Sequence, residues 1–180
     1  MKLVMVIGGV RSGKSAYAER LVAERSTARD RVLYVATGKR YDEEMDARIE
    51  AHRQRRPDRW DTLEAPEDLS ASATAGYDLA LVDTLSAWIG NLLIAVPEER
   101  CRDEETSADI RRGVRSFLDG LRASGLREAI IVTDEAGWGG VAMTPLGRWF
   151  QDAVGEANQR LAAEADEAIA VVAGLPWRLK

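Results

Sequence analysis

The sequence is poor in the residues that build disulfides, metal centres and membrane spans. It has one cysteine and one histidine in 180 residues, which excludes an intrachain disulfide framework and a cysteine-rich zinc site. No apolar run approaches the roughly 20 residues of a transmembrane helix. The apolar start at residues 3–7 is interrupted by Gly8 and Gly9, which is too early for a signal peptide. We therefore expect a cytoplasmic protein with no stable membrane insertion.

An excess of basic residues is also lacking. Lys and Arg together number 25 against 30 Asp and Glu, for a formal net charge of −5, which argues against a nucleic-acid partner. Hydrophobic residues make up 46% of the chain, which is enough for a sizeable core and excludes global disorder. The length predicts a single domain spanning residues 1–180.

Short apolar runs alternate with longer segments of helical periodicity. This alternation predicts an α/β fold in which a mostly parallel sheet carries helices on both faces. The highly charged residues 97–107 are expected to form an exposed loop or the start of a helix. Strands are expected at 3–7, 31–36, 79–82, 129–133 and 168–172, and helices at 15–25, 42–55, 84–95, 110–121 and 146–165.

Residues 8–15 match the phosphate-binding pattern G-x-x-x-x-G-K-[ST], between a predicted strand and a predicted helix. Glycines let successive backbone N–H groups point at phosphate oxygens, and the helix N-terminus adds partial positive charge. Lys14 is expected to reach the β- and γ-phosphates, and the Ser15 hydroxyl to ligate Mg²⁺. The flanking context disfavours a chance glycine-rich turn, so we predict a P-loop nucleotide-binding domain. Its phosphate-binding residues would be Gly8, Gly9, Val10, Arg11, Ser12, Gly13, Lys14 and Ser15.

Acidic residues follow two of the predicted core strands. P-loop proteins place a carboxylate near the magnesium at the end of a neighbouring strand. Asp83 fits this position after residues 79–82, and Asp134 or Glu135 is a second candidate after residues 130–133. Each could instead cap the following helix. We predict that Asp83 and Ser15 form the metal side of the site.

His52 is the single histidine and lies among arginines at 48, 53, 55, 56 and 59. One interpretation places it half-buried on an apolar stripe with Met45 and Ile49. In the other, its imidazole attacks phosphorus and forms a phosphoramidate, while the guanidinium groups clamp the phosphates and keep the imidazole neutral.

Several segments together resemble one family, the bifunctional adenosylcobinamide kinase / adenosylcobinamide-phosphate guanylyltransferases of cobalamin biosynthesis. The P-loop alone is generic, but the histidine segment and the Asn-Gln-Arg-Leu segment are more specific. The similar segments are residues 8–15, 33–37, 42–45, 48–49, His52 with Arg56, Pro57 and Trp60, then 91–93, 133–137 and 158–162.

The resemblance implies a RecA-like P-loop fold and two reactions. A nucleoside triphosphate phosphorylates the aminopropanol hydroxyl of adenosylcobinamide. A histidine, which aligns with His52, then attacks the α-phosphate of GTP and passes GMP to adenosylcobinamide phosphate, giving adenosylcobinamide-GDP. With the Mg²⁺ and the catalytic Lys14 that the P-loop predicts, the resemblance implies GTP and ATP as substrates, His52 as a catalytic residue, and a homotrimer with sites near subunit contacts. The kinase donor is left open between ATP and GTP.

The resemblance also implies nucleotide contacts outside the P-loop. The Glu64 carboxylate would accept from the N1–H and 2-amino groups of guanine. The sequence departs from the family at Asp83, where Glu is frequent, at Gly38, which replaces a hydroxyl residue, and at Asp134, which replaces a frequent Asn. The implied contacts are Ala36, Thr37, Gly38, Arg53, Gln54, Arg55, Arg56, Glu64 and Asp83.

Two other functions remain compatible with the residues. The first is a P-loop small-molecule kinase of another pathway in which His52 is structural. The second is a non-catalytic nucleotide switch module. Covalent guanylylation of the protein would separate the bifunctional enzyme from both.

Overall fold

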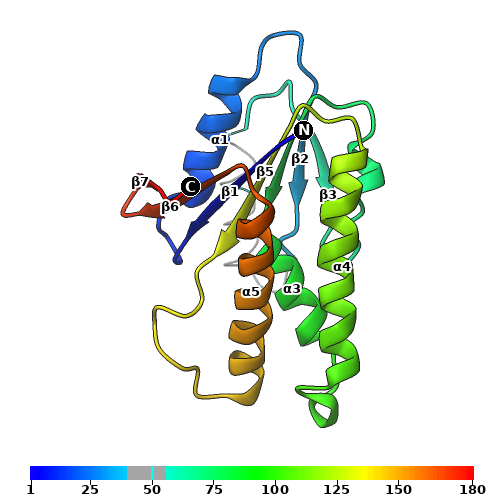
Figure 1. The fold of residues 1–180 in the computed structure, drawn as a ribbon, viewed down its shortest axis with the longest axis vertical. Helices are drawn as coiled ribbons and strands as arrows, with labels where there is room; N and C mark the ends of the chain where they lie inside the picture. The colour runs from blue at the N-terminus through cyan, green and yellow to red at the C-terminus, as the bar shows by residue number, and fades with distance from the viewer. Residues whose placement is uncertain (40–49, 51–55) are drawn as a thin grey trace.

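The computed structural model describes residues 1–39, 50 and 56–180. In this part of the chain, strands form a seven-stranded sheet in the order β3-β2-β4-β5-β1-β6-β7 (Figure 1). The strands are β1 Lys2–Gly8, β2 Val32–Ala36, β3 Asp61–Glu64, β4 Leu79–Asp83, β5 Glu128–Asp134, β6 Glu167–Val172 and β7 Leu175–Arg178. The helices are α1 Lys14–Arg25, α3 Leu85–Ile94, α4 Glu104–Ala123 and α5 Pro145–Glu164, with 3-10 turns η1 Ala71–Thr74 and η2 Glu98–Arg100.

All neighbouring strands run parallel except β6 and β7, which are antiparallel. Strand β5 lies between β1 and β4, with Gly8 opposite Asp134 and Asp83 opposite Val132. The carboxyl ends of parallel strands meet at the same edge of a sheet, where ligands of such folds bind. The P-loop and the two acidic strand ends therefore lie at the same edge.

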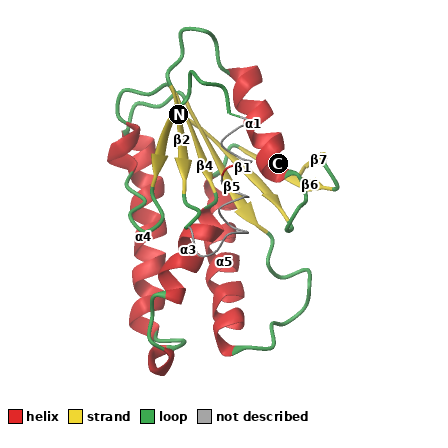
Figure 2. Cartoon of the chain, turned by 180° about the vertical axis from the view of Figure 1, so that it is seen from behind, coloured by secondary structure: helices red, strands yellow, loops and turns green. Residues whose placement is uncertain are grey.

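Helices cover both faces of the sheet (Figure 2). Alternate strand residues enter two separate apolar clusters, because successive side chains of a strand point to opposite faces. Val4, Val6 and Ile130 pack with Val22 of α1 in one cluster. The other cluster joins the opposite faces of the strands to α3, α4 and α5. The predicted α/β architecture, a mostly parallel sheet with helices on both faces, is confirmed.

Two strands were not predicted. β3 is a short edge strand of sequence Asp-Thr-Leu-Glu, and β7, Leu-Pro-Trp-Arg, is exposed throughout. Neither has the apolar run of a strand buried on both faces. α4 also begins earlier than the expected residue 110, because the Asp103 carboxylate caps it by accepting from the Thr106 N–H at 2.9 Å. The helix expected at 42–55 lies outside the described residues, apart from Glu50, which is helical.

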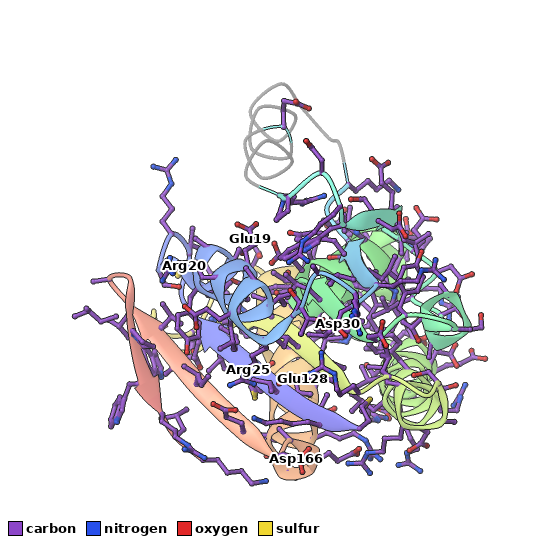
Figure 3. The ribbon with its side chains drawn as sticks, turned by 90° about the horizontal axis from the view of Figure 1, so that it is seen from above. Glu19, Arg20, Arg25, Asp30, Glu128 and Asp166 are labelled. Atoms are coloured by element: carbon purple, nitrogen blue, oxygen red, sulfur yellow. The ribbon has the colours of Figure 1, made fainter. Side chains whose placement is uncertain are left out.

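An ion-pair cluster joins the amino ends of three strands to the end of α1; Figure 3 labels two of its members, Arg25 and Glu128. Arg25, the last residue of α1, pairs with Glu128 at the start of β5 and, at 2.8 Å, with Glu167 at the start of β6. Lys2 of β1 also reaches Glu167 at 2.8 Å. The cluster therefore ties helix α1 to the end of the sheet opposite the P-loop.

Candidate active site

Close approach of the backbone explains the glycines of the P-loop. A Cβ on Gly8 would lie 2.5 Å from Ser12 Oγ and 2.5 Å from the Val171 carbonyl oxygen, so a side chain cannot be accommodated without movement. Gly13 has φ +90°, in the left-handed region that favours glycine. The two positions fix the tight turn between β1 and α1.

The turn between β6 and β7 supports the P-loop from outside. The Gly174 N–H donates to the Ser12 carbonyl oxygen at 2.7 Å. A Cβ on Gly13 would lie 3.2 Å from the Gly174 Cα, so the two backbones are in close contact. Sequence reasoning missed this contact, although the Ala173-Gly174 pair, with φ 52° and 80°, is a typical hairpin turn.

Lys14 is the first residue of α1, and its side chain is buried at the carboxyl edge of the sheet. Its Nζ lies 2.5 Å from Asp134 Oδ1 and donates to the Gly9 carbonyl oxygen at 3.3 Å. The N-cap residue Gly13 offers no side-chain cap, and the first turn of α1 carries no acidic residue. The Lys14 N–H donates to Ser12 Oγ at 3.3 Å, and no capping side chain competes with an anion for the N–H groups that follow it. The helix dipole also favours an anion at this end.

The Asp83 carboxylate accepts hydrogen bonds on both oxygens. Ser15 Oγ donates to Oδ1 at 2.9 Å, and the Tyr34 hydroxyl donates to Oδ2 at 2.5 Å. Burial, and next the charge of Asp83, raise the pKa of Tyr34 well above its usual value. The phenol is therefore held as a protonated donor beneath the carboxylate.

Ser15 and Asp83 fit the needs of a magnesium ion. Mg²⁺ in nucleotide sites is held by one or two protein oxygens together with phosphate oxygens and water. The serine hydroxyl and the carboxylate are already adjacent at 2.9 Å. No cluster of three or more histidine, cysteine or acidic side chains able to hold a metal occurs in the described ranges.

Polar side chains of α3 and α5 hold Asp134 in position through hydrogen bonds. The Ser86 hydroxyl donates to Asp134 Oδ2 at 2.6 Å. Asn158 Nδ2 donates to the Asp134 carbonyl oxygen at 2.9 Å, and Asn158 Oδ1 accepts from the buried Thr133 hydroxyl at 2.7 Å. Asn158 belongs to the Asn-Gln-Arg-Leu segment, so the structure gives this motif a defined place behind the acidic end of β5.

The other predicted nucleotide contacts continue along the same edge. Ala36 lies opposite Asp83 in the β2–β4 pair and opposite Glu64 in the β2–β3 pair. Glu64, Ala36 and Asp83 therefore form a row in register across β3, β2 and β4. On β5 the row steps two residues further, from Val132 opposite Asp83 to Asp134 opposite Gly8 of the P-loop. The four strand spacings from β3 to β1 amount to about 19 Å. Gly38 is exposed beyond this edge.

Thr37 differs from the rest because its side chain is fully buried. Its hydroxyl donates to the Thr84 carbonyl oxygen and accepts from the Thr84 N–H, both at 2.7 Å. Asn91 Nδ2 donates to the Thr37 carbonyl oxygen at 2.8 Å. Thr37 thus joins the segments after β2 and β4, and its contact with a nucleotide stays a prediction.

Arg56 lies over the face of Tyr34, with its guanidinium carbon 3.4 Å from the ring centroid. Such a cation–π contact is favourable and stronger when it is shielded from water. Within the described ranges, Arg56 Nε is buried without a hydrogen-bond acceptor. His52, Arg53, Gln54 and Arg55, the remaining predicted residues of this segment, lie outside the described residues.

The comparisons agree over nearly the whole chain. Residues 4–179 match the family described as cobinamide kinase / cobinamide phosphate guanyltransferase. The bifunctional adenosylcobalamin biosynthesis protein CobU of Escherichia coli is 35% identical over 184 residues, which cover 99% of each chain. The bifunctional adenosylcobalamin biosynthesis protein CobP of Pseudomonas aeruginosa is 39% identical over 180 residues, covering 98% of this chain and 96% of the relative.

A solved structure shows the fold. An ATPase from the type III secretion system of pathogenic bacteria has a TM-score of 0.55 at 12% identity, covering 94% of this chain and 50% of that one. The expected RecA-like P-loop fold is thereby confirmed. With a family match from residue 4 to residue 179, the chain belongs to the cobinamide kinase / cobinamide phosphate guanyltransferase family.

Proposed function

We propose that this chain phosphorylates adenosylcobinamide and then transfers GMP from GTP to adenosylcobinamide phosphate. The observation that carries the proposal is the buried Lys14 ammonium beside Asp134 at the end of β5, with the adjacent Ser15 hydroxyl on Asp83 at the end of β4, in a chain that matches the bifunctional family over residues 4–179. A Lys at the start of a helix, next to a hydroxyl and a carboxylate, is the arrangement that phosphoryl transfer requires.

In the kinase reaction, Lys14 exchanges its contact with Asp134 for the β- and γ-phosphates of the nucleotide. The uncapped N–H groups of α1 hold the phosphate oxygens in place. Mg²⁺, held by Ser15 and Asp83, would neutralise charge on the β- and γ-phosphates. The acceptor hydroxyl gains the γ-phosphoryl group and gives up its proton as the bond to the β-phosphate breaks.

In the guanylyl reaction, an imidazole nitrogen of His52 forms a bond to the α-phosphorus of GTP, and pyrophosphate leaves. A phosphate oxygen of adenosylcobinamide phosphate then attacks the same phosphorus and releases the histidine. The row from the P-loop to Glu64 suits a GTP that lies along the carboxyl edge, with its triphosphate at Lys14 and its base near Glu64. The Glu64 carboxylate would then select guanine.

The assembly and the compartment remain predictions. The homotrimer rests on the family resemblance, the choice of Mg²⁺ on the P-loop motif and the acidic strand end, and the cytoplasmic location on the sequence. No helix within the described residues is long and apolar enough to cross a membrane.

Intact-protein mass spectrometry after incubation with GTP and Mg²⁺ tests the guanylyl step. We expect an acid-labile GMP adduct, because phosphoramidates hydrolyse in acid, and no adduct with ATP. His52→Ala should abolish the adduct and leave GTP binding in place, while Lys14→Ala should weaken the binding of both nucleotides. A folded, GTP-binding wild-type protein that forms no adduct would favour the simple kinase, with His52 structural. If the protein forms the adduct but does not phosphorylate cobinamide, the kinase part of the proposal is wrong and the guanylyl part stands.

A further inference from the structure

We propose that the loop between β5 and α5, residues 135–144, holds the corrin ring of the cobinamide substrate. We call it the acceptor loop. The inference rests on the proposed function and deepens it, since it assigns the macrocycle to a surface of this chain. Figure 1 shows the loop leaving the carboxyl end of β5 beside the turn that follows β1, and extending away from the sheet.

Three large apolar side chains are exposed within six residues of this loop. Trp138 is 70% exposed, Val141 80% and Met143 93%. Trp60, Trp88 and Trp149, in contrast, are at most 6% exposed. Single exposed apolar residues are ordinary on a protein surface, but a group of them is typical of a binding site.

The backbone that presents these side chains is held by hydrogen bonds. Gln151 Nε2 donates to the Ala136 carbonyl oxygen at 2.7 Å and to the Gly140 carbonyl oxygen at 2.8 Å, and its Oε1 accepts from the Ala142 N–H at 2.9 Å. Arg148 donates to the Ala142 and Met143 carbonyl oxygens at 3.0 Å. A surface fixed in this way loses little conformational entropy when a ligand binds.

The loop is also tied to the phosphate site. The Glu135 N–H donates to the Gly8 carbonyl oxygen at 3.1 Å. The Glu135 carboxylate accepts from the N–H groups of Gly137 at 2.9 Å and Trp138 at 3.2 Å. The preceding residue, Asp134, contacts Lys14. One short segment therefore joins the exposed indole to the group that holds the transferring phosphate.

The substrate must place its hydroxyl near the γ-phosphate, because transfer needs reacting atoms about 3–3.5 Å apart. The rest of a molecule as large as cobinamide then has to rest on the surface beside the P-loop. The corrin ring presents broad apolar faces with amide groups at its edge. An indole and a thioether form large, adaptable apolar contacts of the kind that line ligand sites.

Steady-state kinetics of the full chain with adenosylcobinamide test the inference. We expect Trp138→Ala and Met143→Ala to raise the KM for adenosylcobinamide about tenfold or more, as truncation of central apolar contacts commonly does. The KM for the nucleotide and the GMP adduct formed without cobinamide should not change. Trp177→Ala is the matched control, because Trp177 is 67% exposed but lies on the edge strand β7, and it should leave both KM values unchanged.

Oxidation of Met143 by hydrogen peroxide gives a second readout that needs no variant. Adenosylcobinamide should slow formation of the sulfoxide several-fold, and nucleotide alone should not. If Met143 is already protected without substrate, and the variants dissociate the assembly with an unchanged KM, the loop is a subunit contact and the inference is overturned. An unchanged KM in an active enzyme likewise overturns it but leaves the proposed function standing. A wild-type protein that does not use cobinamide overturns both.

Discussion

Tyr34 donates a hydrogen bond of 2.5 Å from its buried hydroxyl to the Oδ2 atom of Asp83. The other oxygen of the same carboxylate accepts from Ser15, the residue that follows the P-loop lysine. Since the tyrosine lies within the sheet and the serine at the start of α1, the carboxylate is fixed between two rigid elements. Its orientation is therefore set by the fold itself.

Tyr34→Phe should weaken the use of magnesium more than the binding of nucleotide. Without the phenol, the Asp83 carboxylate loses one of its donors, and its side chain can rotate more easily away from Ser15. We expect a several-fold higher Mg²⁺ concentration at half-maximal kinase activity, a lower kcat and an unchanged affinity for metal-free ATP. The lost hydrogen bond to a charged group should also cost about 1.5–3 kcal/mol of unfolding free energy. Activity measured against Mg²⁺ concentration, with denaturant unfolding, checks both effects.

Tyr17→Phe provides the control for that variant. Tyr17 is half-buried on α1 and packs against the same apolar cluster as Tyr34. The Tyr17→Phe variant loses the same phenol hydroxyl near the site but leaves Asp83 untouched. Its dependence on Mg²⁺ concentration should therefore match that of the wild type. Equal magnesium curves for the wild type and Tyr34→Phe would show that Asp83 is oriented by other contacts.

Two adjacent glycines should respond very differently to alanine. A Cβ on Gly8 would meet Ser12 Oγ and the Val171 carbonyl oxygen at 2.5 Å, whereas a Cβ on Gly9 would meet nothing within 4 Å. Overpacking of this kind costs about 1–3 kcal/mol, so Gly8→Ala should lower the thermal midpoint of the nucleotide-free protein. Gly9→Ala should leave it nearly unchanged. Similar losses in both variants would mean that the clash at Gly8 is relieved by a small shift of the loop.

Local patterns in the sequence were sufficient to predict the core strands and most helices. They could not predict the order of the strands in the sheet. A buried parallel strand shows as an apolar run wherever it lies in the sheet. Nothing in residues 128–134 indicates that β5 separates β1 from β4. That placement brings Asp134 opposite Gly8 and within 2.5 Å of Lys14 Nζ. The sequence could name Asp134 as an acidic strand end, but not as the partner of the lysine.

Tyr34 and Gly174 were missed for a related reason. In the sequence, Tyr34 is one more apolar residue of a strand, and its role depends on which carboxylate lies next to its hydroxyl. Gly174 belongs to a hairpin whose second strand contains a proline and is exposed, so the pattern gave no reason to expect it beside the P-loop. Both contacts are long-range and arise only from the assembled sheet.

Asp134→Asn should strengthen nucleotide binding by several-fold. In the nucleotide-free protein the Asp134 carboxylate competes with phosphate for the Lys14 ammonium. The amide keeps the shape and the hydrogen bond from Ser86 but removes the competing charge. Titration calorimetry with metal-free ATP measures the change. Asp152→Asn, which removes a charge on α5 that pairs with the exposed Arg102, is the control and should leave the affinity unchanged. A weaker affinity in Asp134→Asn would mean that Asp134 supports the lysine instead of competing for it.

The ion pairs of Glu167 should make the free energy of unfolding depend on pH in the acid range. Burial alone would raise the pKa of Glu167, but the hydrogen bonds from Lys2 and Arg25 outweigh it and hold the pKa below the reference value of 4.5. The unfolded state therefore binds the proton more readily, so the contribution of Glu167 is complete above about pH 4.5 and is lost as the pH falls through the folded value. Glu167→Gln should be about 1–2 kcal/mol less stable than the wild type at pH 7, as expected for lost charged hydrogen bonds. That difference should shrink below pH 4.5. Urea unfolding at a series of pH values tests this, with Glu99→Gln on the exposed turn η2 as the control. A difference that stays constant into the acid range would mean that Glu167 stabilises the fold by packing and not by its charge.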